Sequence, residues 1–317
     1  MSAIEAEGLT RRYGERTVVD SVDLRVDPGR VHALLGPNGS GKTTTVRMLA
    51  TLLRPDSGAA RVAGYDTVRE TGEVRRRIGL VGQFHAVDPR LTGLENLTLF
   101  GRMNGLAGRR ARTHAGELLD RFELSDAADR LARDYSGGMR RRLDIVAAMV
   151  VRPAVLFLDE PTTALDPRSR NEIYSYVADF VAEGTTVLLT TQYLDEAERL
   201  ADTVTILDAG RVVAAGTPHT LTADIGGGLE LVADPRHRDE ITRILADFGA
   251  QPVSGPPDSA EPRATLSYSF RTADIPLLPI LRTLDEFGIE VHDIGRRRAT
   301  LDDAFLALTG PEPRTTP

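Results

Sequence analysis

Residues 36–45 read GPNGSGKTTT, and Lys42 within them is the only lysine of the sequence. The segment matches the pattern G-x-x-x-x-G-K-[ST] and follows a short apolar run, VHALL, as a phosphate-binding loop does. Glycine admits backbone conformations closed to other residues, so successive N–H groups can point inward around an anion. Lysine carries a compact ammonium on a flexible stem, which suits a narrow position between two phosphates better than the planar fork of arginine. The segment therefore predicts a site for a nucleoside triphosphate.

Individual roles follow from this loop and from the helix expected after it. The helix start presents free N–H groups and a partial positive charge, which favour phosphate. Lys42 is expected to contact the β- and γ-phosphates, and Thr43 to bind Mg²⁺. The alternative is a glycine-rich turn with an incidental Lys-Thr pair. The residues of this segment predicted to bind the nucleotide are Gly36, Asn38, Gly39, Ser40, Gly41, Lys42, Thr43 and Thr44.

A second motif, AVLFLDEP, occupies residues 154–161. Its apolar residues lead into Asp159, so the end of a buried strand would place a carboxylate beside the phosphates, where it holds Mg²⁺ directly or through water. Glu160 comes next and is expected to orient or deprotonate the attacking water. An apolar strand that ends in Asp-Glu is weak evidence alone, but it is strong evidence downstream of a phosphate-binding loop. The two motifs together predict hydrolysis of a triphosphate.

The first two thirds of the chain predict the scaffold for these motifs. Short apolar runs alternate with helical patterns, which indicates an α/β domain over residues 1–222 with a largely parallel sheet. Around 88–140 the apolar residues recur three and four apart without a strand, which predicts a helical insertion. Residues 203–216 predict two strands joined by a tight Asp-Ala-Gly turn. The apolar runs expected as buried strands are 31–35, 154–159 and 185–191.

A different pattern begins after a predicted linker at 225–228. Residues 228–310 are expected to form a small α+β domain, and its two helices end alike, in RILADFG (243–249) and RTLDEFG (282–288). This repeat predicts a β-α-β-β-α-β, ferredoxin-like arrangement. The alternative is coincidence, because glycine is the favoured residue after any helix. The tail, 311–317, is expected to be disordered. The strands expected in this domain are 229–233, 264–270 and 289–295.

Composition limits the remaining choices. A length of 317 residues suggests two domains, and 41% hydrophobic with 27% charged residues is ordinary for globular proteins. The absence of cysteine excludes a disulfide framework, a thiolate nucleophile and a Cys-ligated metal. No apolar stretch resembles a signal peptide or a membrane span, so the chain is expected to be soluble. The net charge of −7 argues against nucleic-acid binding, and arginine triplets at 75–77, 140–142 and 296–298 are interpreted as solvated faces or local contacts.

The segment YSGGMRRRLD, residues 135–144, resembles the signature motif of ABC-transporter ATPases, usually written LSGGQ. Its Ser-Gly-Gly is another small-residue loop that opens a helix, and therefore another anion site. The resemblance covers residues 1–222, because further motifs of the family occur in the expected order. It implies four more contributions to ATP binding: Tyr13 stacked on adenine, Gln83 of the Q-loop at Mg²⁺, Ser136 and Gly138 of the signature, and Asp166 of the D-loop TALD.

The resemblance also implies a partner. In the family two ATPase domains pair head to tail, and each ATP lies between the phosphate loop of one and the signature of the other. This chain has one of each, so a second copy of itself is the simplest partner, with two equivalent sites. Tyr135 and Met139 depart from the usual Leu and Gln, and Gln192 stands where the family has the H-loop histidine. An amide can donate a hydrogen bond to the γ-phosphate but cannot shuttle a proton, so Gln192 is predicted to sense that phosphate. The alternative is a surface glutamine after a strand.

Three segments, YSGGMRRRLD, TTQYLDEA and ATLDDAFLALTG, together look like the daunorubicin/doxorubicin-resistance ATPase subfamily. That resemblance implies an ATPase that exports a drug, an antibiotic or a lipid-like compound through a separate membrane permease. The chain would then be cytoplasmic and peripheral on the inner face of the cell membrane, with no nucleic-acid partner. Two alternatives stay open: a soluble ABC-type ATPase, which would usually show two ATPase units or a basic face, and a nucleotide-gated regulator, against which Glu160 argues. The role of the C-terminal domain is not predicted.

Overall fold

The structure, a computed structural model, describes residues 2–223, 227–252, 264–270, 275–298 and 300–309. The chain divides into two compact units, Met1–Thr217 and Pro218–Pro317. Helix α8 (Pro218–Ala223) therefore groups with the second unit, whereas the sequence analysis placed it at the end of the first domain. Of the predicted linker at 225–228, residues 225 and 226 lie outside the described residues, whereas 227 and 228 belong to strand β11 (Gly227–Ala233), so the linker was predicted too long at that end. The predicted tail at 311–317 lies entirely outside the described residues.

Six strands form the main sheet of the first unit. Their bounds are β3 Val31–Leu35, β6 Ile78–Val81, β7 Val155–Asp159, β8 Thr186–Thr191, β9 Thr203–Asp208 and β10 Arg211–Gly216. The order is β10-β9-β3-β8-β7-β6, and all pairs are parallel except β10 with β9. Every residue of β3, β7 and β8 is buried, as expected for a parallel sheet covered on both faces. The three strands predicted from apolar runs and the predicted hairpin are thereby confirmed.

A second, antiparallel sheet was not predicted. It has the order β2-β1-β4-β5, and its bounds are β1 Ile4–Tyr13, β2 Arg16–Val26, β4 Ser57–Val62 and β5 Tyr65–Asp66. Along β2, Val22, Leu24 and Val26 are buried and alternate with exposed residues. Such alternation is typical of a sheet with one face toward solvent, so the signal was present but differs from the continuous apolar runs of the parallel strands.

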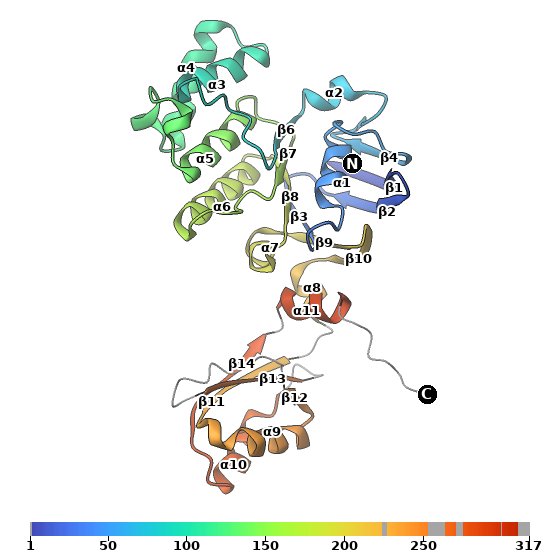
Figure 1. The fold of residues 1–317 in the computed structure, drawn as a ribbon, viewed down its shortest axis with the longest axis vertical. Coiled ribbons are helices and arrows are strands. Elements are labelled where there is room, and N and C mark those ends of the chain that lie inside the picture. The colour runs from blue at the N-terminus through green and yellow to red at the C-terminus, as the bar shows by residue number, and fades with distance from the viewer. Residues whose placement is uncertain (1, 224–226, 253–263, 271–274, 299, 310–317) are drawn as a thin grey trace. The chain divides into compact units, whose positions relative to one another are not determined.

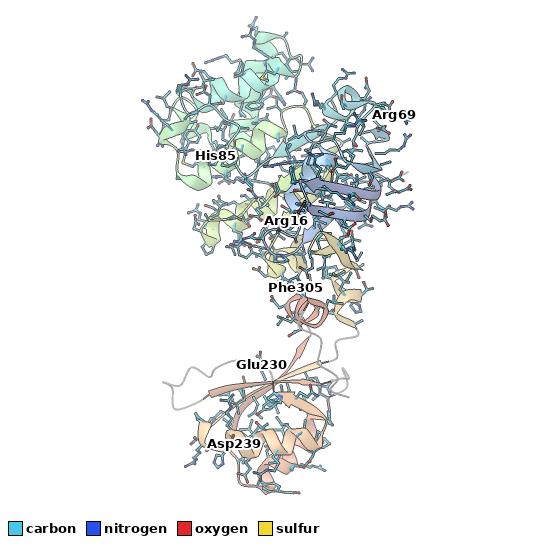
Figure 2. All side chains as sticks on the ribbon, turned by 45° about the vertical axis from the view of Figure 1, so that its right-hand side comes forward. Arg16, Arg69, His85, Glu230, Asp239 and Phe305 are labelled. Carbon is cyan, nitrogen blue, oxygen red and sulfur yellow. The ribbon has the colours of Figure 1, made fainter. Side chains whose placement is uncertain are left out.

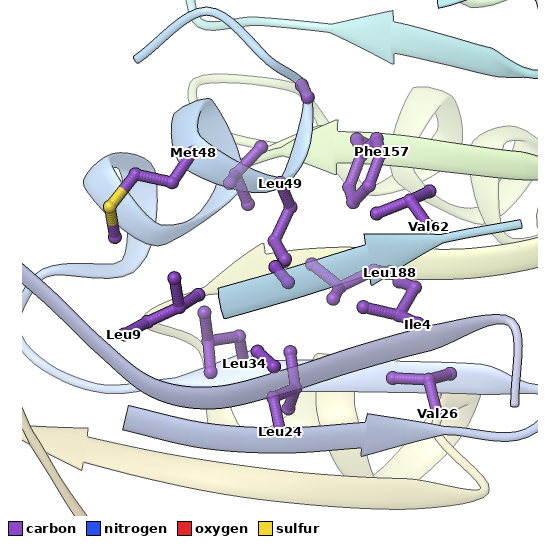
Figure 3. Packing of buried hydrophobic residues seen from close by; sticks show 14 of the residues in the cluster. Ile4, Leu9, Leu24, Val26, Leu34, Met48, Leu49, Val62, Phe157 and Leu188 are labelled. Carbon is purple, nitrogen blue, oxygen red and sulfur yellow. The ribbon is translucent and has the colours of Figure 1, made fainter. Parts of the chain in front are cut away.

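One hydrophobic core joins both sheets to helix α1 (Lys42–Leu49). Figure 3 shows Met48 and Leu49 of this helix among Ile4 of the antiparallel sheet and Phe157 and Leu188 of the parallel sheet. Because α1 packs on both sheets, its first residue, which carries the ammonium group of the phosphate-binding loop, is fixed against the ends of β3 and β7.

Every element between β6 and β7 is helical (Figure 1). The elements are α3 Gly93–Met103, α4 Gly108–Arg121, the 3-10 turns η1 Ser125–Ala127 and η2 Ala132–Asp134, and α5 Gly137–Ala148. Thr92 begins α3 with a capping box, since its hydroxyl accepts from the Glu95 N–H while the Glu95 carboxylate accepts from the Thr92 N–H. A helical subdomain is therefore confirmed. The other helices of this unit are α2 Thr71–Arg75, α6 Pro167–Ala182 and α7 Leu194–Leu200.

The second unit has the ferredoxin-like arrangement that the sequence predicted. Its elements are α8, β11 Gly227–Ala233, η3 Pro235–His237, α9 Arg238–Asp247, β12 Ala250–Pro252, β13 Ala264–Phe270, α10 Leu277–Glu286, β14 Val291–Arg298 and α11 Leu301–Thr309. The sheet order is β12-β13-β11-β14, antiparallel throughout, and α9 and α10 pack on one face around Leu229, Leu231, Leu245 and Leu284 (Figure 1). Strand β12 is not among the three strands that the sequence predicted for this domain.

A buried histidine of β3 makes folding stability sensitive to acid. The His32 ring contacts the hydroxyls of Thr203 at 2.8 Å and Thr205 at 3.1 Å, and burial lowers the pKa of His32 from 6.5 to about 4. Above pH 6.5 the ring is neutral in both states, so it contributes no pH dependence. As the pH falls from 6.5 toward 4, only the unfolded chain gains the proton, so stability is lost.

We expect His32→Asn to remove this loss. Between pH 7.5 and pH 5, the wild-type free energy of unfolding should fall by about 2 kcal/mol more than that of the variant, because each step of pH between the two pKa values costs about 1.4 kcal/mol. Urea unfolding of the full chain at both pH values measures the difference. Parallel pH dependences of the two proteins would contradict the assignment.

Candidate active site

The predicted phosphate-binding loop connects β3 to α1, as the motif requires. Two of its glycines cannot be replaced without backbone movement. A Cβ on Gly36, whose φ is +154°, would lie 2.2 Å from the Leu207 carbonyl oxygen, and one on Gly41, at φ +103°, would lie 2.7 Å from the Val18 carbonyl oxygen. The loop is therefore wedged between neighbouring strands with its backbone N–H groups near the helix start.

Lys42 lies inside this loop, with 4% of its side chain exposed. Its Nζ donates to the carbonyl oxygens of Gly36 at 2.8 Å and Pro37 at 3.1 Å, and lies 3.8 Å from Glu160 Oε1. Burial lowers the pKa of Lys42, while the charges of Glu160 and Asp159 act in the opposite direction. Ser40 Oγ is buried without a hydrogen-bond partner among the described residues. Both groups are donors available to phosphate oxygens.

The three side chains predicted to hold Mg²⁺ meet at one point. Thr43 Oγ1 donates to Asp159 Oδ1 at 3.0 Å, and Gln83 Nε2 donates to Thr43 Oγ1 at 3.3 Å. Thr190 Oγ1 also donates to Asp159 Oδ1, at 2.6 Å. No cluster of three or more His, Cys, Asp or Glu side chains that could hold a metal occurs in the described parts of the chain. One carboxylate beside a threonine hydroxyl, with the Gln83 side-chain amide next to them, fits Mg²⁺, which keeps several waters and takes its other ligands from phosphate.

Thr190 was missed by the sequence analysis, although it lies in a predicted strand. It pairs with Asp159 in the register of β7 and β8, and its carbonyl and hydroxyl oxygens accept from the Glu160 N–H at 3.1 and 3.0 Å. The sequence signal for Thr190 was a polar residue near the end of the apolar segment TTVLLTT (185–191). Only the strand order shows that this strand lies beside β7. Thr190 thus holds both acidic residues of the site.

Glu160 has a backbone conformation that non-glycine residues seldom adopt, with φ +49°. Such conformations cost on the order of 1–3 kcal/mol and cluster at functional sites. The carboxylate is directed to the phosphate-binding loop, where Oε1 lies near Lys42, and Oε2 accepts from Thr163 Oγ1 at 3.5 Å. A base at this place can reach a water molecule beside the terminal phosphate.

The middle arginine of the 140–142 triplet corrects the interpretation of that triplet as a solvated face or a local contact. Arg141 is 6% exposed, and its guanidinium donates to four backbone carbonyls. Three of these belong to the last residue of β7 and the two residues that follow it, and one belongs to the residue after β6. The four carbonyls are those of Gly82, Asp159, Glu160 and Pro161. A pocket of about 380 Å³ lies beside this arginine and is lined by Gln83, Gly137, Glu160 and Thr163 among others.

The predicted signature residues begin helix α5. The exposed Ser136 caps this helix by accepting from the Met139 N–H at 3.2 Å. Asp166 caps α6, where its two carboxylate oxygens accept from the N–H and hydroxyl of Ser169 at 3.0 and 2.7 Å, which lowers the pKa of Asp166. A Cβ on Gly138 would lie 2.5 Å from Ser169 Oγ, so the D-loop and signature elements touch within one chain. The Ser136 hydroxyl itself bonds to its own helix rather than to the 36–43 loop.

Tyr135 explains one departure from the usual signature. Its side chain is 4% exposed, and its hydroxyl donates to the Ala127 carbonyl at 2.7 Å. A Cβ on Gly93 would lie 2.1 Å from this hydroxyl, so the tyrosine fills space above the start of α3. The substitution thus anchors the signature within the helical subdomain and leaves the Ser-Gly-Gly tip exposed.

The other predicted site residues occupy separate places. Tyr13 ends β1 with 48% of its side chain exposed, and the Arg11 guanidinium lies 5.0 Å from its ring centroid. Asn38 is exposed at the tip of the loop, and Thr44 is partly buried in α1. Gln192 follows β8 and is partly exposed. In the described part of the chain, neither Tyr13 nor Gln192 forms a hydrogen bond or an ion pair with Lys42, Asp159 or Glu160.

A buried acid near Gln192 was also missed. Glu196 of α7 is 1% exposed, its Oε1 accepts from Thr162 Oγ1 at 2.8 Å, and burial raises its pKa. Its Oε2 has no hydrogen-bond partner among the described residues. Glu196 therefore ties α7 to the segment that follows Glu160, and the sequence offered no signal for this beyond its place shortly after Gln192.

Fold and site together define a P-loop ATPase with a helical subdomain and a small accessory unit. The ABC transporter family profile matches residues 19–163. The daunorubicin resistance ATP-binding protein DrrA2 of Streptomyces coeruleorubidus is 51% identical over 99% of this chain and 97% of that protein. The Nod factor export ATP-binding protein I of Cupriavidus metallidurans is 38% identical over 99% and 100%. A dimeric ATP-binding cassette, MJ0796 bound to ADP and Pi, matches with a TM-score of 0.62, 27% identity, and coverage of 68% of this chain and 98% of that one.

The chain therefore belongs to the ABC transporter ATP-binding family, in its daunorubicin/doxorubicin-resistance subfamily, and it is an ATPase. The resemblance given by the motifs is confirmed. No helix in the described residues combines the length and apolar character needed to cross a bilayer.

Proposed function

We propose that two copies of this chain close head to tail on two MgATP molecules and thereby drive a separate membrane permease that exports a drug, an antibiotic or a lipid-like compound. The observation that carries this proposal is the exposed Ser136-Gly137 tip of α5. It is a second phosphate-binding helix end in a chain whose 36–43 loop is already a complete phosphate site, so it serves the nucleotide of another subunit. The solved relative MJ0796 is dimeric, which supports this reading.

Within each half-site the residues have distinct roles. Thr43, Gln83 and Asp159 hold Mg²⁺, which when bound offsets charge on the phosphates. Lys42 binds the β- and γ-phosphate oxygens, and the loop glycines and Thr44 surround them. Glu160 orients a water molecule and takes its proton, and Gln192 donates to the γ-phosphate without shuttling a proton. Tyr13 stacks on adenine, and Ser136, Gly138 and Asp166 contact the nucleotide across the dimer.

The permease is expected to dock beside Gln83, with the chain on the cytoplasmic face of the membrane. Phe84 follows Gln83 directly and is 85% exposed, an unusual degree for an aromatic side chain. The exported compound is assigned by similarity to the daunorubicin-resistance and Nod-factor-export proteins. The assay is ATP-dependent accumulation of daunorubicin by inverted vesicles that contain this chain and its membrane permease. Absence of accumulation together with normal ATP hydrolysis would favour a soluble ATPase or a regulator.

Phe84→Ala should separate docking from chemistry. We expect the variant to lose drug accumulation while its basal ATP turnover stays within about twofold of wild type, because an exposed side chain contributes little to stability. Leu52→Ala, at a side chain that is 60% exposed on another segment, is the matched control and should transport normally. Normal transport by Phe84→Ala would contradict docking at this residue.

A further inference from the structure

Helix α5 has an exposed N-terminal tip and two buried, hydrogen-bonded side chains in its middle. Its N-terminal tip, Ser136-Gly137, is exposed. One to two turns later, Arg141 and Asp144 point into the interior, with 6% and 3% of their surfaces exposed. The helix is continuous from Gly137 to Ala148, so a displacement of its tip moves both buried side chains.

The Arg141 guanidinium donates hydrogen bonds to two backbone segments of the ATP site, the one that carries Gln83 and the one that carries Asp159 and Glu160. Its Nη1 donates to the Gly82 carbonyl at 2.7 Å, next to Gln83, and its Nε donates to the Pro161 carbonyl at 2.8 Å. Its Nη2 donates to the Asp159 and Glu160 carbonyls, each at 3.2 Å. Only a guanidinium presents enough donors in a fixed plane to bind four carbonyls at once.

Asp144 holds the opposite side of Gln83. Its Oδ1 accepts from the N–H groups of Ala86 at 2.8 Å and Val87 at 3.2 Å, and its Oδ2 accepts from His85 Nδ1. His85 accordingly lies next to α5 (Figure 2). Gln83 is thus the Mg²⁺-site residue of a segment fixed to α5 on both flanks, by Arg141 before it and by Asp144 after it.

We propose that Arg141 and Asp144 couple the two ATP sites of the dimer. The inference rests on the head-to-tail dimer proposed above, in which the tip of α5 binds the partner subunit's nucleotide. Binding of that nucleotide to the tip displaces α5. Because Arg141 is hydrogen-bonded to the carbonyls of Gly82 and Glu160, those backbone segments move with the helix. Filling of the other site therefore adjusts the positions of Gln83 and Glu160, which a single chain already places beside Thr43 and Lys42. Arg141 touches no substrate, so it is a positioning residue whose effect is on cooperativity.

The test compares ATP turnover at increasing MgATP for the full chain and three variants, Arg141→Lys, Arg141→Met and Asp144→Asn. Wild type is expected to be cooperative, with a Hill coefficient that approaches about 2, the number of sites. Each variant should lower the Hill coefficient toward about 1, and Arg141→Lys should lower kcat about ten- to hundredfold because a misplaced base is inefficient. Its MgATP affinity, measured in a Glu160→Gln background, should change less than about threefold, because Arg141 does not contact the nucleotide.

The matched control is Arg142→Gln, which removes the same charge from the next residue of the helix. Arg142 pairs with Glu172 at 3.4 Å and reaches none of the carbonyls that Arg141 binds. This variant should keep the wild-type Hill coefficient. If Arg141→Met does not fold, as judged by circular dichroism, Arg141→Lys and Asp144→Asn decide the matter.

Two failures are distinguishable. The proposed dimer itself would be contradicted by two results together: a wild-type chain without cooperativity, and a Glu160→Gln chain that stays monomeric with MgATP. A cooperative wild type whose Arg141→Lys and Asp144→Asn variants keep its Hill coefficient would overturn the coupling role alone. A lowered kcat with unchanged cooperativity would overturn it as well, since Arg141 would then only support Glu160.

Discussion

Glu160→Gln is expected to lower ATP turnover by about a hundred- to ten-thousandfold, the usual contribution of a general base. The amide has the shape of the carboxylate but cannot accept the proton of the attacking water. MgATP binding should persist, because Thr43 and Asp159 supply the metal contacts and Lys42 the phosphate contact. The closed dimer should accumulate, since the step that reopens it is blocked. Turnover by phosphate release, and size-exclusion chromatography with light scattering, measure the two effects.

Glu183→Gln is the matched control for this exchange. Glu183 follows α6, pairs with Arg121 at 2.5 Å and Arg152 at 3.7 Å, and lies outside the site. Loss of these pairs should cost at most about 1 kcal/mol of stability and leave turnover unchanged, because partly exposed ion pairs contribute little. Hydrolysis at the wild-type rate by Glu160→Gln would remove Glu160 from the role of base.

The motifs that could be predicted from the sequence are those whose functional residues lie close together along the chain. The loop from Gly36 to Thr44 specifies its own backbone shape, and the strand that ends at Asp159 specifies its own burial. Both were found because local patterns determine local structure. Thr43 and Asp159 were predicted at Mg²⁺ from the two motifs themselves, whereas Gln83 was added to them only through the order of the motifs in a known family.

The residues that were missed act through tertiary contacts. Thr190 reaches Asp159 because β8 lies beside β7, and nothing in the local sequence states that order. Arg141 looked like one of three consecutive surface arginines, yet only the middle one faces the carbonyls of two distant segments. In the sequence, Glu196 resembles any acidic residue of a helix, and only the structure shows that it is bonded to Thr162. A single sequence gives no information on such pairings across the fold.

For the C-terminal unit, the fold could be predicted from the sequence but the function could not. Its β-α-β-β-α-β order could be predicted because each helix is amphipathic and ends in Phe-Gly, with Gly249 and Gly288 at positive φ. The short strand β12 was missed, since Pro252 ends it at the edge of the sheet, where proline is tolerated. Fold alone does not assign an activity, and the sequence of this unit contains no second G-x-x-x-x-G-K-[ST] pattern.

Lys42 offers a test that few chains permit, because it is the only lysine. An amine-directed reagent can modify only Lys42 and the α-amino group of the chain. Burial lowers the pKa of Lys42, which raises the fraction of neutral, nucleophilic amine at a given pH. We expect MgATP to protect Lys42, because the ammonium then binds phosphates, and to leave the α-amino group as reactive as before. Peptide mass spectrometry with and without MgATP measures both sites, and equal modification of Lys42 in the two samples would contradict its contact with the phosphates.

Lys42→Arg should be nearly as damaging as loss of the side chain. The ammonium fits between the carbonyls of Gly36 and Pro37 at 2.8 and 3.1 Å with almost no exposed surface, so the planar and larger guanidinium must displace the loop that surrounds it. Turnover is expected to fall about a hundredfold or more, as when a donor to a developing anion is lost. Arg47→Lys, the reverse exchange at an exposed position of the same helix, should hydrolyse ATP at the wild-type rate. If Lys42→Arg also hydrolyses ATP at the wild-type rate, only the positive charge at this position matters. The proposal that the shape of lysine is required there would then be wrong.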